Sequence, residues 1–153
     1  MLFRSGIVPE PEGQWMNQMA RNLTDAADGF LLGCRFLIQD RWSLFTEQFR
    51  ETLRSAGVES LKLPARSPNL NAYAERFVRT IKESCLDNLI LFGESSLREA
   101  VSQFVEHYHQ ERNHLGPENK IIRPEFAEFP TQGSVHRRKR LGGLLNYYYR
   151  KAA

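Results

Sequence analysis

Short apolar runs alternate with amphipathic segments along the first two thirds of the chain, and this alternation most constrains the fold. Residues 35–39 and 58–63 are short, apolar and bounded by turn residues, which is typical of strands. Around them, apolar residues recur every three or four positions, as in helices that bury one side. We expect strands at 2–8, 35–39 and 58–63, and helices at 15–27, 43–56, 67–86 and 97–109. Strands that feed helices in this order predict an α/β layer.

The segment 67–86 turns at Pro68 and continues as a long amphipathic helix, because proline does not fit a helix interior. Its apolar stripe is formed by Ala74, Phe77, Val78, Ile81 and Cys85. Glu75 lies one turn inside the helix, on the polar side, together with Arg79 and Lys82. Glu75 either forms a surface ion pair with Arg79, four residues further on, or is presented outward as a functional carboxylate.

Two carboxylates follow neighbouring predicted strands. Asp40 stands at the carboxyl end of strand 35–39, and Glu75 lies in the helix entered after strand 58–63. Polar residues at the carboxyl ends of strands in α/β sheets cluster into sites. Carboxylate oxygens are also the ligands that Mg²⁺ takes. The alternative for Asp40 is a turn residue at the end of its strand.

The 153 residues suffice for a hydrophobic core. No stretch approaches 18 consecutive apolar residues, so we expect no membrane span. The N-terminal apolar run is too short for a secretory signal, and we therefore expect a cytoplasmic protein. Cys34 and Cys85 belong to no paired motif, so both are expected to be small buried hydrophobic residues.

The positive charge of the chain is concentrated at its C-terminus, in a basic segment that we take as a separate part, 131–153, after a core of residues 1–130. No acid follows Glu128, whereas six cations do: Arg137, Arg138, Lys139, Arg140, Arg150 and Lys151. Two β-prone runs, 137–141 and 144–150, flank Gly142-Gly143 and predict a β-hairpin.

Three tyrosines lie beside the cations of this hairpin: Tyr147, Tyr148 and Tyr149. Cations next to aromatic rings favour a nucleic acid as partner, since the cations neutralise phosphates and the rings stack on bases. The alternative is an edge hairpin whose charge discourages aggregation.

From residue 35 onward, three motifs in fixed order resemble the catalytic core of DDE integrases and insertion-sequence transposases. They read FLIQDRWSLFTEQF, KLPARSPNLNAYAERFVRTIKESCLDNLI and HYHQERNHLG. In this resemblance Asp40 matches the second acid of the family's catalytic triad and Glu75 the third. It implies an RNase H-like mixed sheet flanked by helices, bound Mg²⁺ or Mn²⁺, and phosphoryl transfer in DNA integration or transposition.

The resemblance also implies DNA partners, both element ends and target, and leaves room for a homo-oligomer. Arg79 and Lys82 resemble the family's contacts to DNA phosphates, which position DNA without reading its sequence. We expect further DNA contacts from the basic run of the hairpin: Arg137, Arg138, Lys139 and Arg140.

The match departs from the family at its first catalytic Asp, which lies on an opening strand well upstream. Asp25 and Asp28 are the acids in place to substitute for it, and both fall in or at the end of helix 15–27. We therefore expect an N-terminally truncated core with little or no strand-transfer activity on its own. The alternatives are a non-catalytic DNA-binding remnant that associates with intact transposase, and an unrelated α/β domain with an accidental motif.

Two further positions leave alternatives open. Trp42 follows Asp-Arg, where the family usually has a small or acidic residue, and its ring either crowds a metal at Asp40 or packs on the next helix. His107 and Glu111 have a spacing that can ligate zinc. The resemblance instead places them at a helix end, in a structural role, before a loop over residues 114–130.

Overall fold

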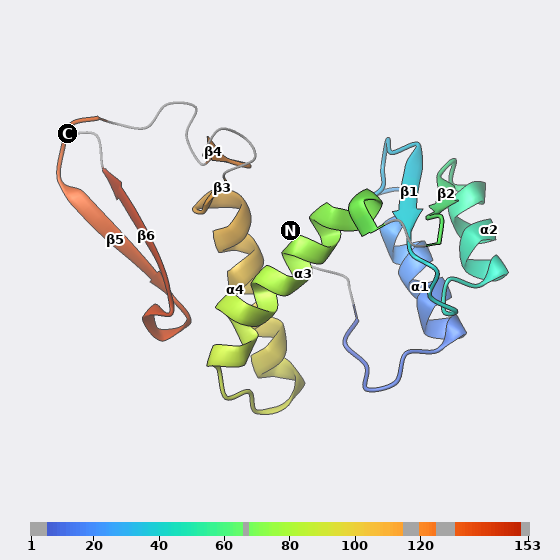
Figure 1. Cartoon of the computed structure of the whole chain (residues 1–153), viewed down its shortest axis with the longest axis horizontal. Helices are drawn as coiled ribbons and strands as arrows, with labels where there is room; N and C mark the ends of the chain where they lie inside the picture. Colours follow the sequence, from blue (N-terminus) through green and yellow to red (C-terminus); the bar gives the residue numbers. More distant parts are fainter. Residues whose placement is uncertain (1–5, 66–67, 115–119, 125–130, 151–153) are drawn as a thin grey trace. The chain divides into compact units, whose positions relative to one another are not determined.

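The computed structural model describes residues 6–65, 68–114, 120–124 and 131–150, and the chain forms two compact units (Figure 1). The first unit is Met1–Arg76 and the second is Phe77–Ala153. The division falls inside helix α3, Ala72–Ser84. No helix in the described part of the chain combines the length and the apolar character that crossing a membrane requires.

The first unit is built around a strand–helix–strand connection. Its elements are α1 (Gly13–Leu23), β1 (Phe36–Gln39), α2 (Glu47–Ser55) and β2 (Glu59–Lys62). The two strands pair in parallel, with Phe36 opposite Glu59 and Gln39 opposite Lys62. Parallel neighbours need a crossover connection, and α2 provides it. The strands predicted at 35–39 and 58–63 are therefore confirmed, and both predicted helices are present but shorter.

The strand predicted at 2–8 is wrong for residues 6–8, which have no regular structure, and its remainder lies outside the described residues. The amide of Gly6 donates a hydrogen bond to the sulfur of Met19 at 3.4 Å. A Cβ at Gly6 would lie 2.8 Å from the ring nitrogen of Trp15. The segment around Gly6 therefore packs against the side chains of Trp15 and Met19 in α1, and residues 6–8 do not form a strand.

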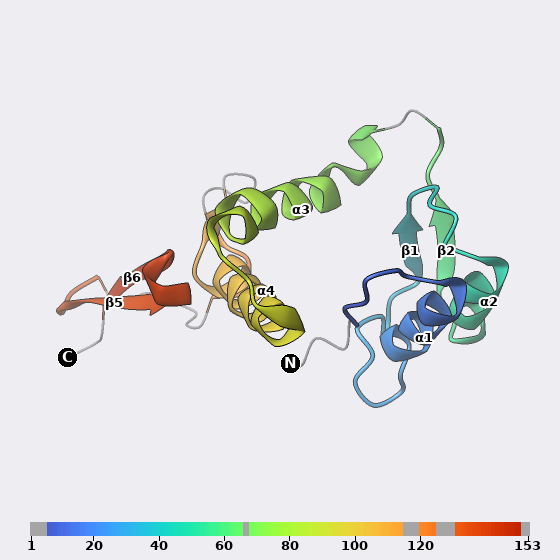
Figure 2. The same ribbon diagram turned by 90° about the horizontal axis from the view of Figure 1, so that it is seen from below.

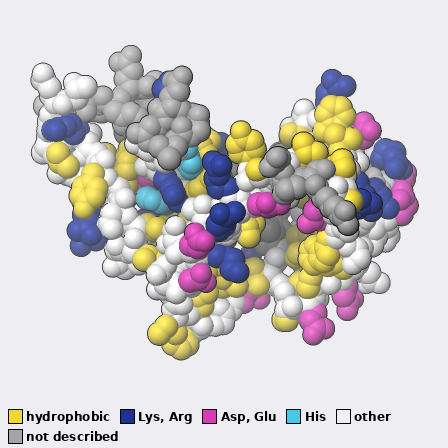
Figure 3. All heavy atoms as spheres, in the orientation of Figure 1, with side chains coloured by type: hydrophobic (Ala, Val, Ile, Leu, Met, Phe, Trp, Pro, Cys, Tyr) yellow, Lys and Arg dark blue, Asp and Glu magenta, His cyan; other side chains and the backbone are white. Residues whose placement is uncertain are grey.

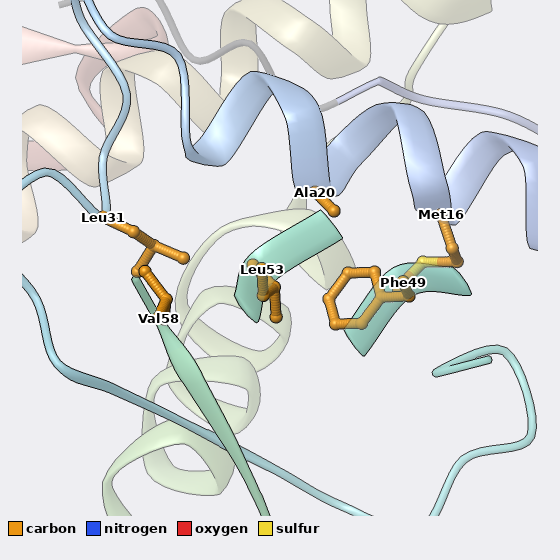
Figure 4. Close-up of a cluster of buried hydrophobic side chains, with 6 residues drawn as sticks. All are labelled: Met16, Ala20, Leu31, Phe49, Leu53 and Val58. Atoms are coloured by element: carbon orange, nitrogen blue, oxygen red, sulfur yellow. The ribbon is translucent and has the colours of Figure 1, made fainter. Parts of the chain in front are cut away.

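The core of the first unit joins α1, α2 and the start of β2. Its buried side chains are Met16, Ala20, Leu31, Phe49, Leu53 and Val58 (Figure 4). Leu37 of β1 packs against this cluster, so one side of the strand pair faces the helices (Figure 2). Burying these apolar side chains stabilises the unit by roughly 1.5–3 kcal/mol for each fully buried large residue.

Both ends of α2 are fixed by local chemistry. The side-chain oxygen of Thr46 accepts a hydrogen bond from the amide of Phe49 at 3.3 Å, which caps the N-terminus. At the other end Gly57 adopts φ +79°, its amide bonds the carbonyl of Arg54, and the amide of Val58 bonds the carbonyl of Leu53. This pair of bonds is a Schellman motif, and it turns the chain directly into β2.

The other face of the strand pair is apolar and open. Phe36 is 47% exposed, Ile38 54% and Leu61 40%. These side chains share a face because strand residues alternate and directly paired residues in a parallel register point the same way. Parallel sheets usually have both faces covered. In the described residues this pair is covered on one face.

The second unit contains two helices followed by short strands and a hairpin. A single 3₁₀ turn at Pro68–Asn71 leads into α3, which begins in the first unit and ends in the second. The other elements of the second unit are the 3₁₀ turn Leu86–Asn88, α4 (Gly93–Gln110), β3 (Asn113–His114), β4 (Lys120–Ile121), β5 (Val135–Arg140) and β6 (Leu145–Arg150). The helices predicted at 67–86 and 97–109 are confirmed. Within the loop expected at 114–130, β4 pairs with β3, while residues 115–119 and 125–130 lie outside the described residues.

The core of the second unit joins α3, α4 and β6. Its buried side chains are Ile81, Cys85, Ala100, Phe104 and Leu145. The ring of Phe77 lies edge-on to those of Phe104 and Tyr108, at 6.1 and 5.1 Å between centroids. The apolar stripe predicted on α3 is therefore confirmed for Phe77, Ile81 and Cys85. Its first-turn member Ala74 and also Val78 are exposed.

The two cysteines differ. Cys85 is fully buried, as predicted, and burial raises the pKa of its thiol. The prediction for Cys34 is wrong, because this residue is exposed. It lies between Gly33, at φ +75°, and the start of β1, in a turn that leaves its side chain outside the core.

The C-terminal hairpin is confirmed, but its loop is longer than a two-residue Gly-Gly turn. Strands β5 and β6 pair antiparallel from Val135 opposite Arg150 to Arg140 opposite Leu145. Residues 141–144 connect them, and Leu141, Gly142 and Gly143 all adopt positive φ. Leu141 of the loop and Leu145, the first residue of β6, both pack against the core of the second unit. They anchor the loop to that core.

The α/β class predicted from the sequence is confirmed. The described strands form three separate two-stranded sheets: β1–β2 parallel, β3–β4 antiparallel and β5–β6 antiparallel. A single mixed sheet of the RNase H type is not assembled from these strands, so the RNase H-like fold stays a prediction.

Replacing Gly57 by alanine should lower the stability of the first unit by about 1–2 kcal/mol, since an L side chain at φ +79° is strained. Replacement by asparagine, which tolerates this backbone conformation, should cost less. Thermal unfolding followed by circular dichroism measures both. Equal melting temperatures for the alanine variant and the unmodified chain would contradict the role of the Schellman turn.

Candidate functional site

Asp40 follows β1 directly and is exposed. Its Oδ1 accepts a hydrogen bond from the amide of Trp42 at 2.9 Å, the turn expected of Asp at a strand end. The ring of Trp42 lies edge-on to that of Phe45, with centroids 6.2 Å apart. Asp40 therefore stabilises the turn after β1, and Trp42 packs toward the segment that leads into α2.

Glu75 lies in the first turn of α3, where the positive end of the helix dipole favours a carboxylate. Glu75, Arg79 and Lys82 are all exposed. Positions three and four apart share a side of a helix, so α3 presents one carboxylate and two cations together. This is the arrangement that the sequence predicted for α3.

Asp40 and Glu75 both belong to the first unit. As exposed carboxylates they are the oxygen ligands that Mg²⁺ or Mn²⁺ takes, and one such ion can be held by one or two carboxylates with water as the remaining ligands. In the described residues no three His, Cys, Asp or Glu side chains form a metal-binding group. The chemistry of these donors suits a hydrated divalent ion, and their convergence on one ion stays a prediction.

Asp25 has a local role in the turn after α1. Its Oδ1 accepts hydrogen bonds from the amides of Ala27 at 2.9 Å and Asp28 at 3.4 Å. Its carbonyl accepts a further bond from the amide of Gly29 at 2.8 Å. A Cβ at Gly29 would lie 2.5 Å from that carbonyl oxygen, so the turn requires glycine there. These contacts agree with a structural interpretation of Asp25.

Among the described residues of the second unit, Glu111, just after the C-terminus of α4, is a buried carboxylate with several charged partners. Its side chain is 1% exposed. It accepts hydrogen bonds from Arg140 at 2.7 Å, from Arg138 at 3.1 Å and from His107 at 2.8 Å. Arg140 also bonds the more exposed Glu106 at 2.8 Å. This cluster ties β5 to α4 through groups that lie far apart in the sequence.

The contacts of Glu111 decide its protonation. Burial alone would raise the pKa of Glu111, but hydrogen bonds from Arg140, His107 and Arg138 outweigh burial and lower the pKa from 4.5 to about 2. Glu111 is therefore an anion at neutral pH. Two guanidinium groups and one imidazole surround this anion, which gives the His107–Glu111 pair a structural role.

The neighbouring residues of that segment are structural as well. The carbonyl of Tyr108 contacts the Nε2 of His114 at 2.7 Å, and the two rings are 4.4 Å apart. Tyr108 packs against the core of the second unit. Tyr108 and His114 therefore help to fix the end of α4 and the start of β3.

The four basic residues of β5 divide between the two faces of the hairpin. Arg138 and Arg140 are half-buried and bond Glu111. Arg137 and Lys139 are exposed on the opposite face. The alternation follows from the two-residue period of a strand. The sequence identified the basic run as a block and missed this division between the two faces.

Residues 56–120 match the integrase core domain family. This match confirms the resemblance to the catalytic core of DDE integrases and transposases. The matched segment contains Glu75, Arg79 and Lys82 as well as Glu111, whereas Asp40 and the hairpin lie outside it. No match was found among curated proteins or among solved structures.

Replacing Glu111 by glutamine should destabilise the second unit by about 3 kcal/mol, because removing one member of a buried ion cluster leaves charged partners uncompensated. The matched control replaces Glu106, which bonds the same arginine from a half-exposed position, and should cost about 0–1 kcal/mol. Thermal unfolding compares the two variants. Equal losses would contradict the dominant role of the buried carboxylate.

The same pair of proteins tests the sign of the pH dependence. Because the folded-state pKa of Glu111 is depressed, its stabilising effect is complete above pH 4.5 and is lost as the pH falls toward 2. The difference in melting temperature between the unmodified chain and Glu111→Gln should therefore be largest near pH 6 and shrink steadily below pH 4.5. A constant difference across this range would contradict the assignment.

Proposed function

We propose that this chain acts on DNA as an integrase-type core, in DNA integration or transposition by metal-dependent phosphoryl transfer. The observation that carries the proposal is the integrase core match over residues 56–120, which includes Glu75 on the exposed polar side of α3. Members of this family act on DNA and typically use a divalent metal. An integrase-like function follows from the match, and the residue roles below are our proposal.

Asp40 and Glu75 would hold the ion, Mg²⁺ or Mn²⁺, through carboxylate oxygens. When bound, such an ion lowers the pKa of an attacking water or hydroxyl and stabilises the leaving oxygen. The chain's own contribution is to present both carboxylates to solvent. One is placed by the turn after β1, the other by the first turn of α3. An RNase H-like arrangement of the strands would bring them together.

Arg79 and Lys82 would contact DNA phosphates beside this site. Both are exposed and lie on the side of α3 that carries Glu75. Cations on phosphates position the DNA and carry no base specificity. The carboxylate of Glu75 one helical turn away would then lie close to the phosphodiester backbone, where the reaction takes place.

A second candidate function is a non-catalytic DNA-binding protein that associates with an intact transposase. The observation that favours it is the absence of a three-residue metal-binding group among the described residues. A two-metal reaction needs more oxygen ligands than two carboxylates supply. We therefore propose that the 153-residue chain alone has little strand-transfer activity.

DNA binding through α3 can be tested by its salt dependence. The double variant Arg79→Gln, Lys82→Gln should bind element-end duplex more weakly, and the slope of log affinity against log salt should fall by about two, because about two phosphate contacts are lost. The control removes two exposed arginines of α1 and α2, in Arg21→Gln, Arg54→Gln, and should leave the slope unchanged. Fluorescence anisotropy gives both slopes. An unchanged slope in the α3 variant would argue against these contacts.

Catalysis is tested by incubating the chain with element-end DNA and Mg²⁺ or Mn²⁺. We expect DNA binding without measurable strand transfer. The variants Asp40→Asn and Glu75→Gln should then bind DNA as the unmodified chain does. Turnover by the unmodified chain that both variants abolish would refute the inactivity of the chain and support the catalytic roles. Turnover that survives both substitutions would refute the roles of the two acids.

A further inference from the structure

The outer face of the C-terminal hairpin carries cations and an exposed aromatic ring. Arg137 is opposite Tyr148 in the register, Val135 is opposite Arg150, and Lys139 is opposite Asn146. Directly opposed residues of an antiparallel pair lie on the same face. Arg137, Lys139, Tyr148 and Arg150 are exposed, and Tyr148 is 61% exposed. We call these four residues the outer face.

The inner face of the hairpin is already engaged. Arg138 and Arg140 bond Glu111, and Leu145 is buried against α3 and α4. The rings of Tyr147 and Tyr149 stack on each other at 5.6 Å. Anchoring through this face fixes the hairpin on α4 and leaves the residues of the outer face exposed.

The cations of the outer face have no acid on their own hairpin, since residues 131–150 contain neither Asp nor Glu. Among the described residues, the acids that pair with the hairpin are Glu106 in α4 and Glu111 just after it, and both bind inner arginines. Alternate strand residues are roughly 7 Å apart, so Arg137 and Lys139 repel each other across a short distance. A surface of this kind is suited to a polyanion, and Figure 3 shows basic and hydrophobic side chains side by side over the hairpin.

The ring of Tyr148 indicates which polyanion is bound. The guanidinium of Arg137 lies 5.9 Å from the centre of this ring and donates to the side chain of Asn146 at 2.8 Å, so the ring and the cation are held together. Contacts to phosphates alone need no aromatic ring. An exposed ring beside cations is the arrangement that binds unpaired strands, whose bases are free to stack, whereas the bases of a duplex are already stacked on one another.

We propose that the outer face binds an unpaired DNA strand, with Tyr148 stacked on a base and Arg137, Lys139 and Arg150 on the phosphates. This inference rests on the DNA binding proposed above and specifies the form of DNA that the hairpin binds. It does not depend on the contacts of α3.

The test measures binding of the full chain to a fluorescein-labelled 12-nucleotide oligothymidine and to a 12-base-pair duplex by anisotropy. Tyr148→Ala should weaken binding of the single strand by about 5- to 100-fold, the range that loss of one stacked base implies. Tyr148→Phe keeps the ring and should bind as the unmodified chain does. Because Tyr148 is exposed, both variants should melt at the temperature of the unmodified chain.

The charge of the outer face is tested in the same assay. Arg137→Gln, Lys139→Gln should weaken binding of the single strand and flatten its salt dependence, while Arg21→Gln, Arg54→Gln should change neither. Unchanged binding of the single strand by Tyr148→Ala would overturn the proposal. So would a loss of duplex binding by Tyr148→Ala as large as its loss of single-strand binding, since Tyr148 would then not select unpaired bases.

The two DNA proposals fail separately. If the hairpin proposal is wrong, Tyr148→Ala binds the single strand normally, while Arg79→Gln, Lys82→Gln still loses affinity for the element-end duplex. If the α3 proposal is wrong, the duplex slope is unchanged in the α3 variant, while Tyr148→Ala still loses affinity for the single strand.

Discussion

The buried carboxylate of Glu111 is the constraint on which the second unit depends. A side chain that is 1% exposed and charged is costly unless it is paired, and here two arginines and a histidine pair it. Since Arg138 and Arg140 come from β5, their bonds fix which face of the hairpin meets α4. The same contact therefore determines both the packing of the C-terminus and the identity of the cations that remain at the surface.

The first unit depends on a different kind of interaction, the burial of apolar side chains between two helices and one face of a strand pair. The positions of its elements follow from local signals that a sequence displays directly. Thr46 is a capping residue at the start of α2, and Gly57 is the residue that allows the left-handed turn at its end. This is why the strand–helix–strand order was predictable: each boundary is set within a few residues of itself.

Two predictions failed because a contact with another element decides the local structure. Nothing near Gly6 in the sequence shows that Met19 and Trp15 hold it against α1, so an apolar run looked like a strand. Leu141 takes a positive φ that leucine seldom adopts, because its side chain is drawn into the core. The sequence therefore predicted a two-residue turn, because a Gly-Gly pair favours one, and the four-residue loop was missed.

The positions of Asp40 and Glu75 after neighbouring strands made them candidates, and the resemblance then gave them roles in a catalytic triad. Asp40 has the exposure and the turn bond of an ordinary strand-end Asp, and Glu75 has the exposure of an ordinary helix-start Glu. Glu111 was noticed for its spacing from His107, but its partners lie 27 and 29 residues further on. The division of the basic run between two faces could have been predicted, because side chains alternate between the faces of a strand and a strand was predicted there.

The uncovered apolar face of β1 and β2 has a practical consequence for the handling of the protein. Phe36, Ile38 and Leu61 together offer an exposed hydrophobic surface on a two-stranded sheet. Copies of the first unit prepared alone should adhere to one another as their concentration rises. Crystallisation and spectroscopy of that fragment therefore call for dilute samples or a mild detergent.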